Sequence, residues 1–376
     1  MPSAVFSPLA DRIPEARGPV FPLHVGDTWM EPWEGARMES LRVAEHPGMH
    51  RYCPTQGIPE LVDALVEKVR AQNGLACERD GVLVCGGATA GLAAAVGALA
   101  DPGEEVLILA PFWPLIRGIV QALRASPVEV PFYDRVDSAE AAVEAVRERI
   151  GPRSVALYFS TPSNPTGRVL SGAWLAALAE LAREAGLWIL SDEVYEDYVY
   201  RGEHVSIARF APERTLSVFS FSKAYGMAGN RVGYLVGPPD AVAQAHKLGV
   251  HTVYHAPTAS QLAALRALAG GAAWVREARA AYRRAGEDAA RVLGLPPPEG
   301  SMFLFADASR ALDERGIAGF LEDCFEDGVL VAPGASSGEA YARWIRLCYS
   351  SAPPEQVAEA IRRLARHLVG DGPRFD

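Results

Sequence analysis

The feature that most constrains the fold of this chain is an alternation of strand and helix patterns between residues 82 and 236. Short apolar runs, which favour buried strands, alternate there with longer segments of helical periodicity. We predict strands at residues 82–85, 106–109, 155–159, 187–190, 216–219 and 232–236, and helices at 90–100, 114–123, 139–150 and 173–185. This alternation indicates a mainly parallel sheet with helices on both faces, because parallel strands need crossover connections.

The rest of the chain suggests a second, smaller domain. We expect helices at 57–73, 260–293, 317–325 and 354–368, and strands at 302–305, 329–331 and 344–348. The 376 residues are enough for one large and one smaller domain. We therefore predict an α/β fold with a three-layer α/β/α large domain over 46–270 and a smaller α/β domain built from both chain ends. Residues 271–376 form most of that smaller domain, and an N-terminal segment, 1–45, packs with it.

Composition excludes several function classes. The net charge is −10 with neutral histidines, and the chain has no basic tract that could bind nucleic acid. The run of small apolar residues at 88–100 is too short and too rich in glycine to span a bilayer, and residues 1–20 contain no apolar signal core. The five cysteines are scattered and form no Cys-x-x-Cys pair, which argues against a metal site or a disulfide framework. We expect a cytoplasmic protein without metal, nucleic-acid or membrane partners.

A lysine that directly follows a predicted strand is the first candidate for chemistry. It lies in Ser220-Phe221-Ser222-Lys223, and Arg231 follows eight positions later. A buried ammonium is costly, so a lysine there is better used as a neutral amine, for example in a Schiff base with pyridoxal phosphate (PLP). The serines and Arg231 could bind a phosphate. Taken alone, the motif is more typical of a surface lysine in a glycine-rich turn.

Other polar and aromatic residues follow the predicted strands, where open parallel sheets bind their ligands. Gly87 lies in Gly86-Gly87-Ala88-Thr89, a helix start that could bind an anion, although such a turn is more often just a capped helix. Trp113 could stack on a planar ring, or pack in the core. Asn164 lies between two prolines, which fix its position more than a plain turn requires. Asp192 ends a strand and needs a cationic partner such as a protonated pyridine nitrogen, with Tyr195 three residues later.

These motifs, in this order, resemble the fold type I PLP enzymes of the class I/II aminotransferase family, in the aspartate aminotransferase superfamily. The resemblance covers nearly the whole chain. Each motif is modest evidence, and together they are strong. The matching motifs are Tyr52…Gly57, Gly86-Gly87-Ala88-Thr89, Pro111-Phe112-Trp113, Asn164-Pro165-Thr166-Gly167, Ser191-Asp192-Glu193-Val194-Tyr195, Ser220-Phe221-Ser222-Lys223, Arg231-Val232-Gly233, Val331-Ala332-Pro333-Gly334 and Trp344-Ile345-Arg346-Leu347-Cys348.

The resemblance implies a catalytic role for three residues. Lys223 would carry the internal aldimine with PLP and shuttle a proton between the substrate and the cofactor. Asp192 would keep the pyridine nitrogen protonated, so that the ring can accept electrons. Tyr195, together with Asn164, would bond to the phenolic oxygen of the ring, and Trp113 would stack on it.

The resemblance also implies binding roles. Arg346 would hold the substrate α-carboxylate as a bidentate fork, while Asn164 and Gly26 would also contact the substrate. Tyr52 would reach the phosphate of a neighbouring subunit, so the enzyme is expected to be a homodimer with shared active sites. The phosphate-binding residues would be Gly87, Ala88, Thr89, Ser220, Ser222 and Arg231.

The reaction implied is transfer of an amino group from an α-amino acid to a 2-oxo acid. C–S β-elimination or decarboxylation is the alternative, because the same cofactor serves all three reactions. Remote alternatives are a non-catalytic PLP-binding protein and a serine hydrolase. The hydrolase would use Ser336 in Gly334-Ala335-Ser336-Ser337-Gly338, with His367 the one histidine that follows it.

The donor is expected to be an amino acid without a second carboxylate. The resemblance implies that two segments line the side-chain pocket: the stretch from Gly26 to Trp29, which is acidic and aromatic, and residues 250–257, which hold two histidines. Asp27 would repel a distal carboxylate, and Trp29 would offer an apolar or cation-friendly wall. Aromatic, aliphatic or cationic amino acids are therefore favoured over aspartate. The alternative is that Arg37, Arg42 or Arg51 reaches into the pocket and binds a second carboxylate.

Overall fold

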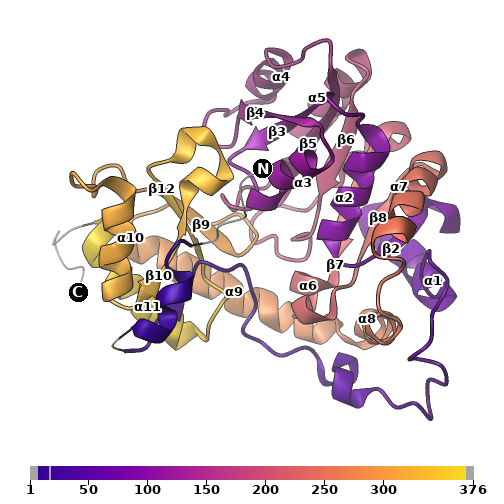
Figure 1. The fold of residues 1–376 in the computed structure, drawn as a ribbon, viewed down its shortest axis with the longest axis horizontal. Coiled ribbons are helices and arrows are strands. Elements are labelled where there is room, and N and C mark those ends of the chain that lie inside the picture. The colour runs from indigo at the N-terminus through magenta and orange to yellow at the C-terminus, as the bar shows by residue number, and fades with distance from the viewer. Residues whose placement is uncertain (1–6, 17, 370–376) are drawn as a thin grey trace.

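The structure is a computed structural model that describes residues 7–16 and 18–369, so the outermost parts of the predicted N-terminal segment and smaller domain lie outside the described residues. A seven-stranded sheet forms the centre of the larger part (Figure 1). Its neighbouring strands are parallel, except that β8 runs antiparallel to both of its neighbours. In spatial order the strands are β2 (Val82–Cys85), β8 (Gly233–Val236), β7 (Thr215–Ser220), β6 (Trp188–Asp192), β5 (Ser154–Ser160), β3 (Glu105–Ala110) and β4 (Ser126–Pro131).

Helices cover both faces of this sheet, which confirms the predicted three-layer arrangement. In β3, Val106 and Ile108 point into a core shared with α2 (Ala88–Leu99), α3 (Pro114–Ala122) and α7 (Pro239–Thr252). Leu107 and Leu109 point the other way, into a core shared with α4 (Ala139–Arg147) and α5 (Gly172–Glu184). Alternate residues of a strand point to opposite faces, so an unbroken apolar run suits a strand buried on both sides.

The prediction lacks the strand β4, the short helix α6 (Phe221–Ala224) and the helix α7 of this part. Strand β4 pairs with β3 at the edge of the sheet and contains two prolines, Pro127 and Pro131. Proline weakens a strand pattern but is tolerated at an edge, where one side of the strand needs no partner. Helix α7 begins with Pro239 at its first turn.

The single helix predicted at 260–293 is in fact two helices. Helix α8 (Thr258–Gly270) ends at a glycine pair, and α9 (Ala272–Val292) begins after Gly271. A side chain at Gly271 would lie 2.6 Å from the backbone oxygen of Ala267, so the chain can turn tightly here. The helix predicted at 57–73 is present as α1 (Pro59–Lys68), followed by a π-helical turn over Val69–Asn73.

The C-terminal part contains a three-stranded antiparallel sheet, in the order β11 (Ala332–Pro333), β12 (Trp344–Cys348) and β9 (Phe303–Asp307). Helices α9, α10 (Gly316–Glu326) and α11 (Pro354–Leu368) share a core with this sheet.

The N-terminal segment contacts both parts of the molecule. Strand β1 (Phe21–Pro22) pairs with β10 (Val329–Leu330) in parallel. Further along, Trp33 packs against Gly270 at the end of α8. In Figure 1 this indigo segment accordingly runs from beside α11 and β10 to the neighbourhood of α8. The domain boundaries at residues 45/46 and 270/271 remain predictions.

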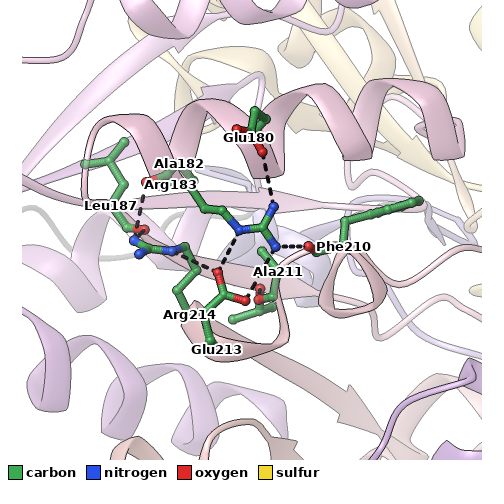
Figure 2. Close-up of polar contacts among 9 residues, drawn as sticks. Glu180, Ala182, Arg183, Leu187, Phe210, Ala211, Glu213 and Arg214 are labelled. Atoms are coloured by element: carbon green, nitrogen blue, oxygen red, sulfur yellow. Dashed lines mark hydrogen bonds and ion pairs between the residues drawn. The ribbon is translucent and has the colours of Figure 1, made fainter.

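Polar contacts hold the amino ends of the central strands, as Figure 2 shows. Arg183 of α5 donates to Glu213 (Nε to Oε1, 2.9 Å) and to Glu180 (Nη1 to Oε2, 3.2 Å). Arg214, directly before β7, donates to the backbone oxygen of Leu187, directly before β6, at 3.0 Å. Exposed ion pairs of this kind contribute about 0–1 kcal/mol each. They position the loops at the end of the sheet opposite the carboxyl edge, where the site described below lies.

Within the described part of the chain, no helix combines the length and the apolar character needed to cross a membrane.

Two helical glycines allow a test of how tightly α9 is packed. A side chain at Gly286 of α9 would lie 2.8 Å from the ring of the fully buried Tyr349, whereas a side chain at Gly249 of α7 would meet nothing within 4 Å. Ala favours a helix over Gly by about 1 kcal/mol, but overpacking a core costs about 1–3 kcal/mol. We expect Gly286→Ala to lower the thermal unfolding midpoint and Gly249→Ala to leave it unchanged or raise it. Equal shifts of the two variants in calorimetry would contradict this packing.

Candidate active site

A cavity of about 200 Å³ opens at the carboxyl edge of the central sheet. Strands β2, β3, β5, β6 and β7 all end at this edge, and the antiparallel β8 begins there. Ligands of open α/β sheets bind at such an edge. The cavity brings together most of the residues that the sequence singled out: Gly26, Ala88, Thr89, Trp113, Asn164, Asp192, Tyr195, Ser220, Ser222, Lys223, Arg231 and Arg346.

Lys223 enters the cavity from the short helix α6 (Phe221–Ala224), which directly follows β7. Its Nζ donates to the backbone oxygen of Gly26 at 2.5 Å and lies 3.9 Å from Oδ1 of Asp27. Burial lowers the pKa of Lys223, although the charge of Asp27 opposes this shift. The environment therefore favours the neutral amine, which is the nucleophilic form.

Asp192 is the last residue of β6, and its side chain lines the same cavity. Its Oδ2 accepts a hydrogen bond from the hydroxyl of Tyr158 at 2.9 Å, and its Oδ1 accepts a long one from the backbone N–H of Val194 at 3.4 Å. Both donors are uncharged. Burial raises the pKa of Asp192 to about 6, more than the donors lower it. A cation placed beside this carboxylate would be stabilised and would in turn keep it ionised.

The Gly86–Thr89 turn and Arg231 form a corner in which a guanidinium lies beside the start of a helix. Gly87 has φ +79°, and a side chain there would lie 2.3 Å from Nη2 of Arg231. Arg231 Nη1 donates to the backbone oxygen of Ala228 at 2.9 Å and to the hydroxyl of Ser222 at 3.4 Å. Helix α2 begins at Ala88, so its first N–H groups are open at this corner.

Arg346 comes from the middle of β12 and is almost fully buried, at 2% exposure. Its Nη1 donates to Oδ1 of Asn164 at 3.1 Å, and its Nη2 donates to the backbone oxygen of His24 at 2.8 Å. The guanidinium also lies over the ring of Phe303, 4.8 Å from its centroid. Burial, and then the charge of Arg346, lower the pKa of His24 to about 4, so this histidine adds no second charge at neutral pH.

Two aromatic side chains, those of Tyr195 and Trp113, also line the cavity. Tyr195 is 4% exposed and packs edge-on against Phe303 at 5.8 Å between centroids. Burial raises the pKa of Tyr195 above its ordinary value, so the phenol stays protonated and can donate a hydrogen bond. Trp113, at the start of α3, lines the cavity from another side.

Some of the expected residues lie elsewhere in the described chain. Tyr52 is 83% exposed, lies outside the cavity, and packs edge-on against Tyr254 at 5.2 Å between centroids. Residues 253–256 line a second, smaller hollow beside β2 instead of the expected side-chain pocket. Trp29 is also absent from the cavity lining. Of the two segments expected to form the pocket, only Gly26 lines the cavity, because residues 250–252 belong to α7 and residues 252–256 line the second hollow.

The sequence analysis missed several residues of the site. Val25, Leu92, Leu115 and Phe303 form apolar walls, and Tyr158 contacts Asp192. Apolar residues in strands and helices carry no signal that separates a cavity wall from a core. One feature of the sequence could have identified Tyr158. It precedes Ser160, the last residue of β5, by two positions, so the two side chains lie on the same face of the strand.

The structure gives no support to a serine hydrolase. Ser336 lies in a 3-10 helix over Gly334–Ser337, and its hydroxyl donates to the backbone oxygen of Pro333 at 2.7 Å. His367, the histidine that the hydrolase would need, pairs with Asp327 at 2.8 Å.

Comparison with known proteins places this arrangement in a family. The sequence matches the family described as "Aminotransferase class I and II" over residues 19–364. The aspartate/prephenate aminotransferase of Thermus thermophilus is 37% identical over 88% of this chain and 86% of its own length. The arginine–pyruvate transaminase of Pseudomonas aeruginosa is 34% identical over 85% of this chain and 82% of its own. A solved structure of Thermus thermophilus aspartate aminotransferase with maleate superimposes with a TM-score of 0.88 at 34% identity, covering 98% of this chain and 97% of that one. The chain thus belongs to the class I and II aminotransferase family and is a transaminase.

Proposed function

We propose that the cavity binds PLP and that Lys223 joins it covalently. The observation that carries this proposal is the placement of the lysines. The sequence contains three: Lys68, Lys223 and Lys247. Lys68 is paired with Glu196, and Lys247 is exposed on α7. Lys223 lines the cavity, where burial favours its neutral form.

The other cavity residues fit the same cofactor. Gly87, whose missing side chain leaves room beside Arg231, belongs to a corner suited to a phosphate. Asp192 is a buried carboxylate whose donors are uncharged, which suits a protonated ring nitrogen. When bound, PLP supplies an electron sink for negative charge at the substrate α-carbon.

The residues of this chain then have separate tasks. Arg346 holds the substrate α-carboxylate, with Asn164 fixing the guanidinium from one side. Lys223 moves a proton to and from the α-carbon through its Nζ, which suits an amine with a lowered pKa. Tyr195 donates its phenolic proton as a hydrogen bond, since the raised pKa keeps that proton in place.

We infer that the active unit is a homodimer with shared sites. Tyr52 is an exposed aromatic side chain, and Val253 and Tyr254 beside it are 49% and 46% exposed. Exposed apolar clusters of this kind mark interaction surfaces. In the proposed dimer a second copy covers this cluster, and Tyr52 reaches the phosphate of the neighbouring subunit.

We infer that the amino donor has an aromatic, aliphatic or cationic side chain. Among the described residues, the cations that line the cavity are Lys223, Arg231 and Arg346, and each already has a role in the proposal. Asp27, whose Oδ1 lies 3.9 Å from Nζ of Lys223, adds negative charge beside this lysine. Much of the remaining wall is apolar: Val25, Leu92, Leu115 and Phe303. A second carboxylate would find no cation reserved for it within this chain's part of the cavity.

A cytoplasmic location is part of the same proposal. All five cysteines are free thiols, and four of them are buried. A reducing compartment preserves such thiols.

The first prediction concerns Lys223. When the protein is incubated with PLP and reduced with borohydride, the wild type should gain one cofactor mass on the peptide that contains residue 223. Lys223→Ala should gain none, because its cavity has no other lysine, while Lys247→Ala should behave as the wild type. Mass spectrometry of the digested protein measures this. A cofactor adduct on Lys68 or Lys247 in the Lys223→Ala protein would refute the assignment.

The second prediction concerns the dimer. Tyr52→Ala and Lys223→Ala proteins, each weakly active or inactive, should regain activity when mixed under conditions that allow subunit exchange. About a quarter of the wild-type activity is expected, because half of the dimers are then mixed and each has one intact site. Native mass spectrometry confirms the exchange. Complete exchange without recovery of activity would show that Tyr52 does not act across the interface.

The third prediction concerns the donor. Steady-state kcat/KM values with one 2-oxo acid acceptor should be higher for aromatic, aliphatic or cationic donors than for aspartate or glutamate. Asp27→Asn should raise kcat/KM for aspartate above the wild-type value, since it removes a negative charge near Lys223. If aspartate or glutamate leads by tenfold or more in the wild type, another cation reaches the pocket and the inference is wrong.

A further inference from the structure

A buried tyrosine contacts Asp192 from behind the cavity. Tyr158 lies in β5, is 0% exposed, and packs in the core between the sheet and α2. Its hydroxyl donates to Oδ2 of Asp192 at 2.9 Å across the neighbouring strands β5 and β6. Tyr158 itself does not line the cavity. It can therefore influence ligands there through Asp192.

The direction of this hydrogen bond is fixed. Burial, and then the charge of Asp192, raise the pKa of Tyr158 well above its ordinary value, so the phenol keeps its proton throughout the neutral range. A protonated phenol beside a carboxylate donates to it and favours its ionised form. The other oxygen of Asp192 has a much longer contact, 3.4 Å from the N–H of Val194. The bond from Tyr158 is thus the stronger of the two that hold this side chain.

We propose that Tyr158 is a positioning residue that acts through Asp192, holding this carboxylate ionised and in one orientation so that it can pair with a protonated ring nitrogen. The inference rests on the role proposed above for Asp192. It assigns Tyr158 a purpose beyond packing, because a phenylalanine would fill the same space without the donor.

The other titratable groups near Asp192 do not replace this donor. Tyr133 donates to the backbone oxygen of Ser160 at 2.6 Å instead. Tyr195 faces Phe303 and the cavity. Glu193 points away, where it accepts from Ser206 at 2.8 Å and pairs with His204 at 2.8 Å.

Tyr133 provides a matched control. It is buried like Tyr158, at 2% exposure, and its hydroxyl also makes a hydrogen bond inside the same sheet, but not to Asp192. The variants Tyr158→Phe and Tyr133→Phe remove the same atom. Tyr133→Phe removes two buried hydrogen bonds, because the Tyr133 hydroxyl also accepts from the N–H of Ser160 at 3.2 Å. A purely structural role therefore predicts an effect of Tyr133→Phe at least as large as that of Tyr158→Phe.

The test measures the titration of Asp192 in the cofactor-free protein, by carbon NMR of protein labelled at the aspartate carboxyl carbons, with Asp192→Asn assigning the signal. The wild-type carboxyl is expected to titrate with a pKa of about 6. Tyr158→Phe should raise its proton affinity about tenfold or more, because a charge-assisted hydrogen bond is lost. It should also weaken PLP binding about tenfold, measured by equilibrium dialysis at pH 7. Tyr133→Phe should change neither quantity by more than about twofold.

The proposal is overturned if the two variants titrate alike, or if Tyr158→Phe binds PLP as the wild type does. Should Tyr158→Phe fail to fold, incorporation of 3-fluorotyrosine at position 158 keeps the shape and makes the phenol a stronger donor. The proton affinity of Asp192 should then fall, and an unchanged titration would equally overturn the proposal. Failure of the proposed function is separate, because it would appear as a wild-type protein that does not bind PLP at all.

Discussion

The structure depends on one buried guanidinium that joins three distant parts of the chain. Arg346, in the small antiparallel sheet, donates to Asn164 in the loop after β5, at the carboxyl edge of the central sheet. It also donates to the backbone oxygen of His24 in the N-terminal segment. A buried cation is costly unless its donors are satisfied, so these partners must stay where they are. The same bonds bring Gly26, two residues after His24, over Lys223. The cavity therefore exists only when all three segments are assembled.

Burial then shifts the pKa values of two groups that line this cavity in opposite directions. It lowers the pKa of Lys223, which favours the neutral amine, and raises the pKa of Asp192 to about 6. For Asp192 the folded protein binds a proton more tightly than the unfolded chain. Its contribution thus favours folding at low pH and is lost as the pH rises from about 4 to about 6. For Lys223 the folded protein binds its proton less tightly, so at neutral pH its burial also opposes folding. At neutral pH, the burial of Asp192 and of Lys223 therefore lowers the free energy of unfolding. The environment that causes this loss of stability suits a ligand with a cationic ring nitrogen and a reactive carbonyl.

Comparison with the relatives sharpens the question of the substrate. Relatives of similar identity are named for aspartate and prephenate in one case and for arginine and pyruvate in another. The amino donor therefore varies within the family while the transamination chemistry is shared. Much of the wall that would contact a donor side chain is apolar, and Val25 and Phe303 come from segments at opposite ends of the chain.

The sequence by itself determined the class of fold and the polar residues of the site. Apolar runs between helical segments specify a mainly parallel sheet. The motifs of Lys223, Asp192 and Asn164 are ambiguous one by one, and they indicate a site because they occur near the ends of successive strands and in the order found in the class I/II aminotransferases. Local signals failed where a residue's role depends on its neighbours. The prolines of β4 are acceptable only at an edge, and the break at Gly271 depends on the close approach of Ala267. Tyr158 looks like any other core aromatic until β6 places Asp192 at 2.9 Å. Only the tertiary structure decides such contacts, because they join segments far apart in the chain whose partners no local pattern encodes.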